Sequence, residues 1–370
     1  MKILFVFNHP APYKVNLLNG LSKYHDLDVI FERKGNSNRP ENFYYQKENK
    51  FQFKYHFCSG IKIGEENHIG FYLKRFIKKN HKNYDLIIMN GYSTISEIIA
   101  IKYMIKHNIR YTLYVNGGKI RSDKNTYKLN LKKELISKAF NYFSPCQETN
   151  QYLIHYGADK KKIYNYIYST VYEKEVLPCP LSRDDKKRIR LSNGLDISST
   201  INFVTFGQFI DRKNNKPLLE IFKNLPDNYH LTLIGDGEEK DQYQDFIINN
   251  NLSNKIKILP FKTQIELLPF LRNYDYFISI SKEDIYGHMI NEALSQGLPV
   301  IASNAIVSAN ALIKSGINGI IVKYDDISAI KDAIINCQTL ESSECIKTAQ
   351  ENTIEKMIES HLKIFEELQK

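Results

Sequence analysis

The sequence predicts an α/β protein made of two doubly wound domains, each a parallel sheet covered by helices. Buried-looking strands alternate with helical patterns along most of the chain, which is typical of parallel sheets. Prolines, mixed charges and small polar residues interrupt this alternation at residues 170–200, which we interpret as the connection between the halves. A length of 370 residues also favours two domains over one.

The predicted N-terminal domain covers residues 1–172. Its strands are expected at KILFVF (2–7), LDVIFE (27–32), YDLIIMN (84–90) and RYTLYVNGG (110–118), with helical spacing in APYKVNLLNGLSKYH, GFYLKRFIKKNHKN and ISEIIAIKYMIKHN. Residues 35–60 are polar and aromatic, and we expect a loop and a hairpin there.

The predicted C-terminal domain covers residues 173–350. Its strands are expected at INFVTFGQF (201–209), YHLTLIGDG (229–237), KIKILPF (255–261), DYFISIS (275–281) and LPVIAS (298–303), with helices between them. Residues 351–370 show helical spacing of apolar side chains, and we expect this helix to pack back on the N-terminal domain.

The charge of the chain is unevenly distributed. The net charge is +10, but residues 1–170 hold 28 Lys and Arg against 13 Asp and Glu, while residues 171–370 hold 23 against 28. This excess predicts a polyanionic partner of the first half: an anionic membrane surface, a phosphorylated substrate or nucleic acid. No nucleic-acid recognition motif accompanies the charge, so nucleic acid is not expected as a partner.

Cysteine usage and hydropathy predict a cytoplasmic location. The five cysteines show no CxxC spacing, which favours a reducing compartment and argues against a disulfide framework or a zinc site. The opening MKILFVF is too short for a signal peptide, and no apolar run approaches the length of a membrane span. Peripheral binding to the inner face of a membrane remains compatible with these features.

Two common nucleotide sites are absent from the sequence. The first strand-to-helix turn, FNHPAPYK, has no GxGxxG, which argues against a nicotinamide or flavin site, and there is no GxxxxGK[ST] loop. The pair Asp26-x-Asp28 is similar to acids that hold a metal in some nucleotide-sugar enzymes, but its place in a polar turn favours a structural role. No metal site is predicted.

Cations and glycines follow two strands of the second half. Gln208, Arg212 and Lys213 come after one strand, where a diphosphate would need positive charge, although a solvated loop is the alternative. Gly235 and Gly237 end the next strand and would allow either a plain tight turn or close approach to a base or ribose.

The segment SKEDIYGHMINEALSQGLPVIAS (281–303) combines acids, a glycine and a helix start. A helix beginning near Met289 would present unpaired N–H groups to a diphosphate, with Gly287 allowing close approach. Asp284 would accept hydrogen bonds from sugar hydroxyls, and Glu292 would bind a ribose diol with both oxygens. The alternative is that both acids only favour the helix dipole.

These stretches together resemble the retaining glycosyltransferases of family 4, which have the GT-B fold. DIYGHMINEALSQGLPVIAS is similar to that family's E-x7-E segment, GQFIDRKN to its G-x-L-x-x-x-K-G loop, LIGDGEE to its I-G-x-G turn, and SGINGIIV to the D-G-x-N-G-x-L-V stretch. Three positions depart from the family pattern: Asp284 replaces a glutamate, Gln208 an arginine, and Asn116 a histidine.

The resemblance implies an α/β GT-B protein that transfers a hexose or N-acetylhexosamine, with retention, from a nucleotide diphosphate sugar, a UDP-sugar first of all. No cofactor or essential metal is implied, and the acceptor would be a glycan or a lipid-linked glycan in surface polysaccharide synthesis. The catalytic positions would be Asp284, Glu292, Arg212 and Lys213. Substrate-binding positions would be Gln208, Gly235, Gly237, Ile285, Tyr286, Gly287, His288, Met289, Asn116 and Gly117.

The basic excess of the first half is concentrated in two segments, 72–82 and 119–138, where lysines and arginines alternate with apolar residues. This pattern favours a surface that lies on an anionic membrane, with a solvated lysine-rich face as the alternative. Two other functions stay open for the whole chain: a nucleotide-sugar epimerase of the same fold, and a binding module without catalysis. Loops 35–65 and 116–128 are the places where acceptor choice is expected, but they carry no motif.

Overall fold

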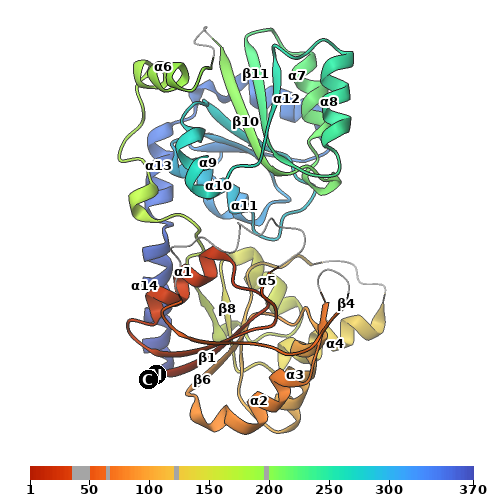
Figure 1. Cartoon of the computed structure of the whole chain (residues 1–370), viewed down its shortest axis with the longest axis vertical. Coiled ribbons are helices and arrows are strands. Elements are labelled where there is room, and N and C mark those ends of the chain that lie inside the picture. Colours follow the sequence, from red (N-terminus) through yellow and green to blue (C-terminus); the bar gives the residue numbers. More distant parts are fainter. Residues whose placement is uncertain (36–50, 64–66, 121–124, 196–199) are drawn as a thin grey trace. The chain divides into compact units, whose positions relative to one another are not determined.

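The computed structural model describes residues 1–35, 51–63, 67–120, 125–195 and 200–370, and it divides into two compact units (Figure 1). The first unit comprises Met1–Ser169 together with Ile354–Lys370, and the second comprises Thr170–Thr353. The chain therefore passes between the units twice, after Ser169 and after Thr353. Each passage lies three residues from the domain end expected from the sequence, at 172 and at 350.

The first unit is built on a seven-stranded parallel sheet with the order β3-β2-β1-β6-β7-β8-β9. Its strands are β1 (Lys2–Phe7), β2 (Asp26–Phe31), β3 (Lys54–Phe57), β6 (Leu86–Met89), β7 (Thr112–Tyr114), β8 (Asn141–Ser144) and β9 (Ile163–Asn165). Its helices are α1 (Pro12–Leu21), α2 (Tyr72–Asn80), α3 (Ile95–Lys106), α4 (Thr126–Ser137), α5 (Gln147–His155) and α14 (Ile354–Gln369). A short antiparallel pair, β4 (Ile61–Ile63) and β5 (Asn67–Ile69), stands apart from the sheet.

Side chains of β1 alternate between the two faces of this sheet. Leu4 and Val6 belong to the apolar core that also contains residues of α2, α3 and α4. Phe7 instead lies in an aromatic cluster with Tyr114, which in turn stacks on His361 of α14 at a ring distance of 5.6 Å. Because successive side chains of a strand point to opposite faces, β1 contributes to the core on both faces of the sheet.

The helix α14 belongs to the first unit, although the whole second unit separates it in sequence from the rest of the first. Phe365 is fully buried and lies 6.1 Å from the ring of Phe143 on β8. His361 is also buried, and its Nε2 lies 3.2 Å from the Tyr114 hydroxyl. Burial lowers the pKa of His361 to about 4, so this imidazole is neutral at physiological pH.

The second unit is built on a six-stranded parallel sheet with the order β12-β11-β10-β13-β14-β15. Its strands are β10 (Ile201–Gln208), β11 (Tyr229–Asp236), β12 (Ile256–Leu259), β13 (Tyr276–Ser279), β14 (Val300–Ser303) and β15 (Gly319–Val322). Its helices are α6 (Arg183–Ser192), α7 (Lys216–Lys223), α8 (Lys240–Asn249), α9 (Gln264–Leu271), α10 (Met289–Ser295), α11 (Val307–Leu312), α12 (Ile327–Asn336) and α13 (Ser342–Gln350). Two apolar clusters fill its core.

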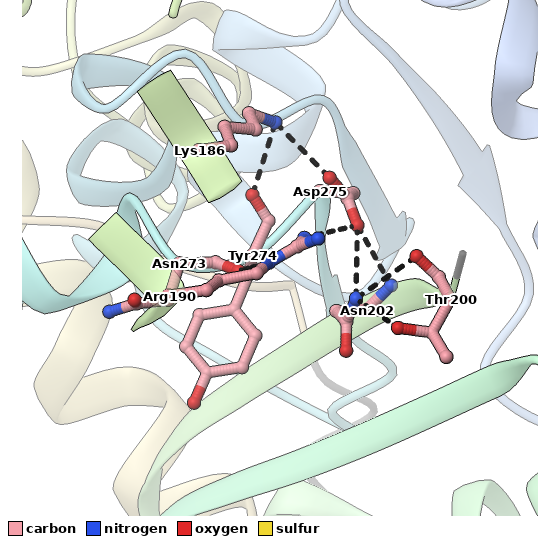
Figure 2. Close-up of polar contacts among 7 residues, drawn as sticks. All are labelled: Lys186, Arg190, Thr200, Asn202, Asn273, Tyr274 and Asp275. Atoms are coloured by element: carbon pink, nitrogen blue, oxygen red, sulfur yellow. Dashed lines mark hydrogen bonds and ion pairs between the residues drawn. The ribbon is translucent and has the colours of Figure 1, made fainter. Parts of the chain in front are cut away.

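Residues 170–200 are not the simple connection expected from the sequence, because α6 lies inside them and is tied to the sheet by Asp275, just before β13. Arg190 Nη2 lies 2.7 Å from Asp275 Oδ2, Lys186 Nζ lies 3.3 Å from Oδ1, and the Asn202 N–H donates to Oδ2 at 2.9 Å (Figure 2). Three donors from two elements thus converge on one carboxylate. The helix follows from the Ser182–Asp185 capping box that begins it.

A second expectation was wrong at the edge of the first sheet. Lys54–Phe57 forms the parallel edge strand β3, paired with β2, in place of a hairpin; residues 36–50 of the same segment lie outside the described residues. Throughout the described parts of the chain, no helix is both long enough and apolar enough to cross a membrane.

Candidate functional site

The carboxyl edge of the second unit's sheet brings together residues that are about 70 positions apart in sequence. β10 and β13 are parallel neighbours, so the segments that follow them leave the sheet at the same edge. After β10 the chain makes a 3-10 turn at Asp211–Lys213, and after β13 it forms a loop that leads into α10. The predicted cations and the first predicted acid therefore meet at this edge.

Asp284 is held by both predicted cations. Lys213 Nζ lies 2.7 Å from Asp284 Oδ2 and Arg212 Nη1 lies 3.4 Å from the same oxygen, while Nη1 also donates to the Glu283 carbonyl at 2.7 Å. The side chains of Lys213 and Asp284 are only 9% and 15% exposed, and that of Arg212 is 41% exposed. Burial alone would raise the pKa of Asp284, but Lys213 and Arg212 hold it below its ordinary value.

The loop that carries Asp284 is fixed by the segment that opens α11. The Asp284 N–H donates to the Ala305 carbonyl at 3.1 Å, and the Ser308 N–H donates to the Tyr286 carbonyl at 2.8 Å. Gly287 has a φ of +90°, and a Cβ at this position would lie 2.6 Å from Ile306 Cγ2. Only glycine meets both constraints without strain, so packing within the loop already explains this residue.

Gly235 and Gly237, predicted to allow approach to a ligand, are required by the neighbouring strand. The φ of Gly235 is +155°, and a Cβ there would overlap the Gly207 carbonyl oxygen of β10. A Cβ on Gly237 would lie 2.5 Å from the Phe209 carbonyl oxygen. The two glycines thus let the ends of β10 and β11 approach closely, next to the cations that follow β10.

The remaining predicted positions of this edge differ in exposure. Gln208 ends β10 and is half-buried, as are His288 and Met289 at the start of α10, whereas Tyr286 is buried and Ile285 is exposed. The Tyr286 and His288 rings lie 5.0 Å apart, and Met289 Sδ lies 3.6 Å from Lys213 Nζ. Met289 therefore contacts the cation that pairs with Asp284.

Glu292 lies on α10, one turn after its start, and its carboxylate has partners that the sequence did not indicate. Thr170 Oγ1 donates to Glu292 Oε1 at 3.0 Å, and Gln264 Nε2 donates to the same oxygen at 3.1 Å. Gln264 follows Thr263 in a T-x-x-E capping box, a pattern that places it at a helix start. No sequence signal marks Thr170, because its role depends on tertiary contact.

Asn116 and Gly117 belong to the first unit, where they follow β7. Asn116 Nδ2 donates to Asn90 Oδ1 at 3.2 Å, and its own Oδ1 accepts from the Tyr166 hydroxyl at 3.2 Å. The structure thus places both residues at the carboxyl edge of the first sheet, in a polar network of that unit.

The same edge of the first unit carries a buried group that the sequence did not indicate: Lys14, Glu32 and Glu97. Their exposed fractions are 4%, 1% and 0%. Thr94 joins the two acids, because its hydroxyl donates to Glu32 Oε1 at 2.6 Å and its N–H donates to Glu97 Oε2 at 3.1 Å. Lys14 Nζ donates to Asn8 Oδ1 at 2.7 Å.

Burial dominates the ionisation of this group. It raises the pKa of Glu32 to about 8, with Glu97 adding to the effect, and it lowers the pKa of Lys14 to about 7. The pKa of Glu97 is also raised, chiefly by burial. Each of these positions has an apolar or aromatic neighbour on at least one side in sequence, and nothing in the pattern separates them from ordinary helix and strand-end residues.

The pair Asp26-x-Asp28 has structural partners. Asp26 Oδ1 lies 3.4 Å from Lys54 Nζ, and Asp28 Oδ2 accepts from the Tyr84 hydroxyl at 2.6 Å. Both acids lie within β2, not in a turn before it. Among the residues that the structure describes, no group of three or more His, Cys, Asp or Glu is placed to hold a metal ion.

Comparisons with known proteins agree with these features. Residues 189–356 match the family described as glycosyl transferases group 1. A stretch of 131 residues, 35% of this chain and 37% of the relative, is 30% identical to the lipopolysaccharide core biosynthesis glycosyltransferase LpsE of Rhizobium meliloti (strain 1021). The chain thus spans little more than a third of that relative's length.

Solved structures match over the entire chain. Anabaena Alr3699/HepE in complex with UDP aligns with a TM-score of 0.76 at 18% identity, covering 100% of both chains. The lipopolysaccharide outer core galactosyltransferase WaaB, in its apo form, aligns with a TM-score of 0.72 at 16% identity, covering 99% of this chain and 100% of that one. At such identities the likeness concerns the fold, and it confirms the predicted α/β GT-B class with two Rossmann-like domains.

Proposed function

We propose that the protein is a retaining glycosyltransferase that uses a nucleotide diphosphate sugar, because residues 189–356 match the family described as glycosyl transferases group 1. The proposed donor is a UDP-sugar carrying a hexose or N-acetylhexosamine. The proposed acceptor is a glycan or lipid-linked glycan of a surface polysaccharide. One of the similar structures is a complex with UDP and another is a lipopolysaccharide outer core galactosyltransferase, which supports this choice of classes.

The convergence of Arg212 and Lys213 on Asp284 is the observation that carries the proposal. Both cations follow β10 at the carboxyl edge of the sheet, where α/β proteins bind ligands, and one of them is almost completely buried. A buried ammonium and a planar guanidinium match the charge of a diphosphate. In the proposed complex the diphosphate shares these cations with Asp284.

The proposed chemistry breaks the bond between the sugar's anomeric carbon and the diphosphate, which leaves with the electron pair. The acceptor hydroxyl oxygen forms the new bond on the same face, and its proton passes to the leaving diphosphate. Arg212 and Lys213 stabilise the charge that develops on the leaving group, so no metal is needed for this purpose. Asp284 and Glu292 hold the sugar and the ribose, respectively.

A calorimetric screen of UDP, GDP and their sugars, followed by product analysis by NMR, tests the proposal. Turnover with retained anomeric configuration supports it. Isomerised donor would indicate an epimerase, and binding without any turnover would indicate a binding module. The cation role is tested by Arg212→Gln, for which we expect at least roughly tenfold weaker binding of UDP but unchanged binding of uridine.

A matched control for Arg212→Gln is Lys257→Gln. Lys257 is exposed and lies on β12, near the opposite, amino edge of the same sheet. The Lys257→Gln substitution removes one positive charge from the same unit and should leave the affinity for UDP unchanged. Equal loss in both variants would contradict a specific diphosphate site.

We also propose that the first unit binds an anionic membrane through α2 and α4. Arg75, Lys78 and Lys79 on α2 and Lys128 and Lys133 on α4 are exposed, and Phe71 and Tyr127 beside them are 54% and 72% exposed. Arg121 and Lys124 of the predicted basic segment lie outside the described residues. Exposed cations next to exposed aromatic rings suit a membrane interface.

Sedimentation with vesicles tests the membrane proposal. We expect binding to vesicles containing phosphatidylserine at low salt, release as ionic strength rises, and no binding to pure phosphatidylcholine. Absence of binding at low salt would contradict it. Salt-sensitive binding would support the peripheral membrane association expected from the sequence.

A further inference from the structure

The carboxylate of Glu292 is held by two donors that come from outside its own helix. Thr170 Oγ1 lies 3.0 Å from Glu292 Oε1, and Gln264 Nε2 lies 3.1 Å from the same oxygen. Gln264 Nε2 also donates to the Thr170 carbonyl at 3.0 Å, and an amide nitrogen carries the two hydrogens that these two bonds need. The three residues therefore form a closed hydrogen-bonded triangle.

Both donors are themselves fixed. Gln264 is the first residue of α9 and lies within the capping box in which Thr263 Oγ1 and N–H both donate to Glu266 Oε2, at 2.8 and 2.9 Å. Thr170 is 8% exposed and is the first residue of the second unit, immediately after the first passage of the chain between the units. A side chain held by such donors keeps one orientation.

The helix α10 that carries Glu292 is also tied to chain segments next to both passages. Asn291 Nδ2 donates to the Asn352 carbonyl at 2.7 Å, two residues before the second passage. The Leu177 N–H donates to the Ser295 carbonyl at 2.9 Å. The orientation of α10, and of Glu292 on it, is thus linked to the backbone on the second unit's side of each passage.

We propose that Thr170 and Gln264 are positioning residues that orient the Glu292 carboxylate for the ribose hydroxyls of the donor nucleotide. This inference rests on the proposed function, in which Glu292 binds the ribose diol. A free glutamate side chain loses rotamer freedom when it binds a ligand, and this loss weakens binding. Two hydrogen bonds to Oε1 restrict the side chain before the ligand arrives, so the affinity for the diol is higher.

Nucleotides with and without ribose hydroxyls test this role. Binding of UDP and of 2′,3′-dideoxyuridine diphosphate is measured by calorimetry for the wild type, Thr170→Val and Gln264→Leu; the guanosine pair replaces them if the screen selects GDP. We expect each substitution to weaken UDP binding roughly three- to tenfold, the range of one hydrogen bond. Binding of the dideoxy form should not change, because it offers Glu292 no hydroxyl.

Two further variants serve as controls. Thr170→Ser keeps the hydroxyl and should restore the UDP affinity of the wild type. Thr348→Val removes a hydroxyl from an equally buried threonine of the same unit, one that donates to the Glu344 carbonyl and accepts from Asn318. It should leave the ratio of the two affinities unchanged.

The possible failures are distinguishable. If Thr170→Val and Gln264→Leu weaken both ligands equally, or weaken neither, the positioning role is wrong while the proposed function stands. If the wild type itself binds UDP and the dideoxy form equally, Glu292 does not bind the ribose, and that part of the proposed function fails together with the inference.

Discussion

At the carboxyl edge of the second unit's sheet, Asp284 lies 2.7 Å from Lys213 and its pKa is held below the ordinary value, against the effect of burial. At the corresponding edge of the first unit's sheet, Glu32 is also removed from water, with 1% of it exposed, but its pKa is raised to about 8, and that of Lys14 is lowered to about 7. At both edges, acids and a lysine lie after parallel strands. The pKa of Asp284 favours its charged form, whereas the pKa values of Glu32 and Lys14 are shifted toward their neutral forms.

The difference depends on pairing more than on burial. Asp284 has a directly contacting ammonium and a guanidinium within 3.4 Å. Glu32 accepts its hydrogen bond from a neutral threonine hydroxyl, and Lys14 donates to a neutral amide. A carboxylate without a close cation is destabilised by desolvation and keeps its proton. The cations at the edge of the second unit's sheet suit an anionic ligand. At the edge of the first unit's sheet, Glu32 and Lys14 have pKa values of about 8 and about 7.

The largest effect is expected from Asp284→Asn, which removes the carboxylate that pairs with Lys213 and Arg212. Lys213, whose side chain is 9% exposed, would then be buried without its anionic partner. We expect a loss of about 3 kcal/mol in the free energy of unfolding at pH 7.5, measured in urea. Since the pKa of Asp284 is lowered in the folded state, the wild type's advantage exists above the unfolded pKa and is lost as pH falls through the folded one.

Asp236→Asn is the control for this prediction. Asp236 lies at the end of β11, 3.2 Å from Lys240, but its side chain is 65% exposed, so this pair is screened by water. Its loss should change the free energy of unfolding by less than about 1 kcal/mol. Similar losses in the two variants would mean that burial does not distinguish the Asp284 pair.

A second comparison between the edges uses two glycines with the same backbone angle. Gly287, beside Asp284, and Gly91, after β6 of the first unit, both have a φ of +90°. A Cβ on Gly287 would lie 2.6 Å from Ile306, whereas a Cβ on Gly91 meets nothing within 4 Å. We expect Gly287→Ala to cost about 2–3 kcal/mol of unfolding free energy and Gly91→Ala about 1 kcal/mol. Equal costs in thermal or urea unfolding would show that the loop around Gly287 adjusts freely.

The sequence predicts the strands and helices of both sheets well because their patterns are local. KILFVF, LDVIFE and DYFISIS are rich in apolar residues, and β1, β2 and β13 overlap them. The edge strand Lys54–Phe57 was missed because its side chains are mostly exposed and its pairing with β2 is non-local. Helix α6 was missed because its charged residues resemble a linker; its stabilising partner, Asp275, is 85 residues from Arg190.

The site was predictable only where a residue's role follows from its place after a strand. Arg212 and Lys213 were expected to face a diphosphate, and the parallel pairing of β10 with β13 brings them to Asp284. Their pairing with Asp284 was not predicted, because the spacing within one segment says nothing about a segment 70 residues away. Thr170 and Glu32 were not indicated by the sequence for the same reason, because their contacts with Glu292 and Thr94 are tertiary.

An effect of opposite sign is expected from Glu32→Gln at the carboxyl edge of the first unit's sheet. The folded-state pKa of Glu32, about 8, lies above the ordinary value of 4.5, so between these values the folded protein holds a proton that the unfolded chain has released. The wild type therefore loses stability as pH rises through this window. Glutamine keeps an acceptor for Thr94 and carries no charge, so Glu32→Gln should be more stable than the wild type at pH 8 and equal to it near pH 4.5.

Urea unfolding of both proteins between pH 4.5 and 8 checks this prediction, with Glu367→Gln as the control. Glu367 lies on α14 of the same unit and is exposed, so Glu367→Gln removes a carboxylate of that unit without altering the buried cluster. Glu97 and Lys14 face the same cluster and titrate with it, and because the pKa of Lys14 is lowered by burial, its effect has the opposite sign and appears above about pH 7. A Glu32→Gln variant that is less stable at pH 8 would show that Glu32 is ionised and paired in the folded state, and the contrast between the two edges would not hold.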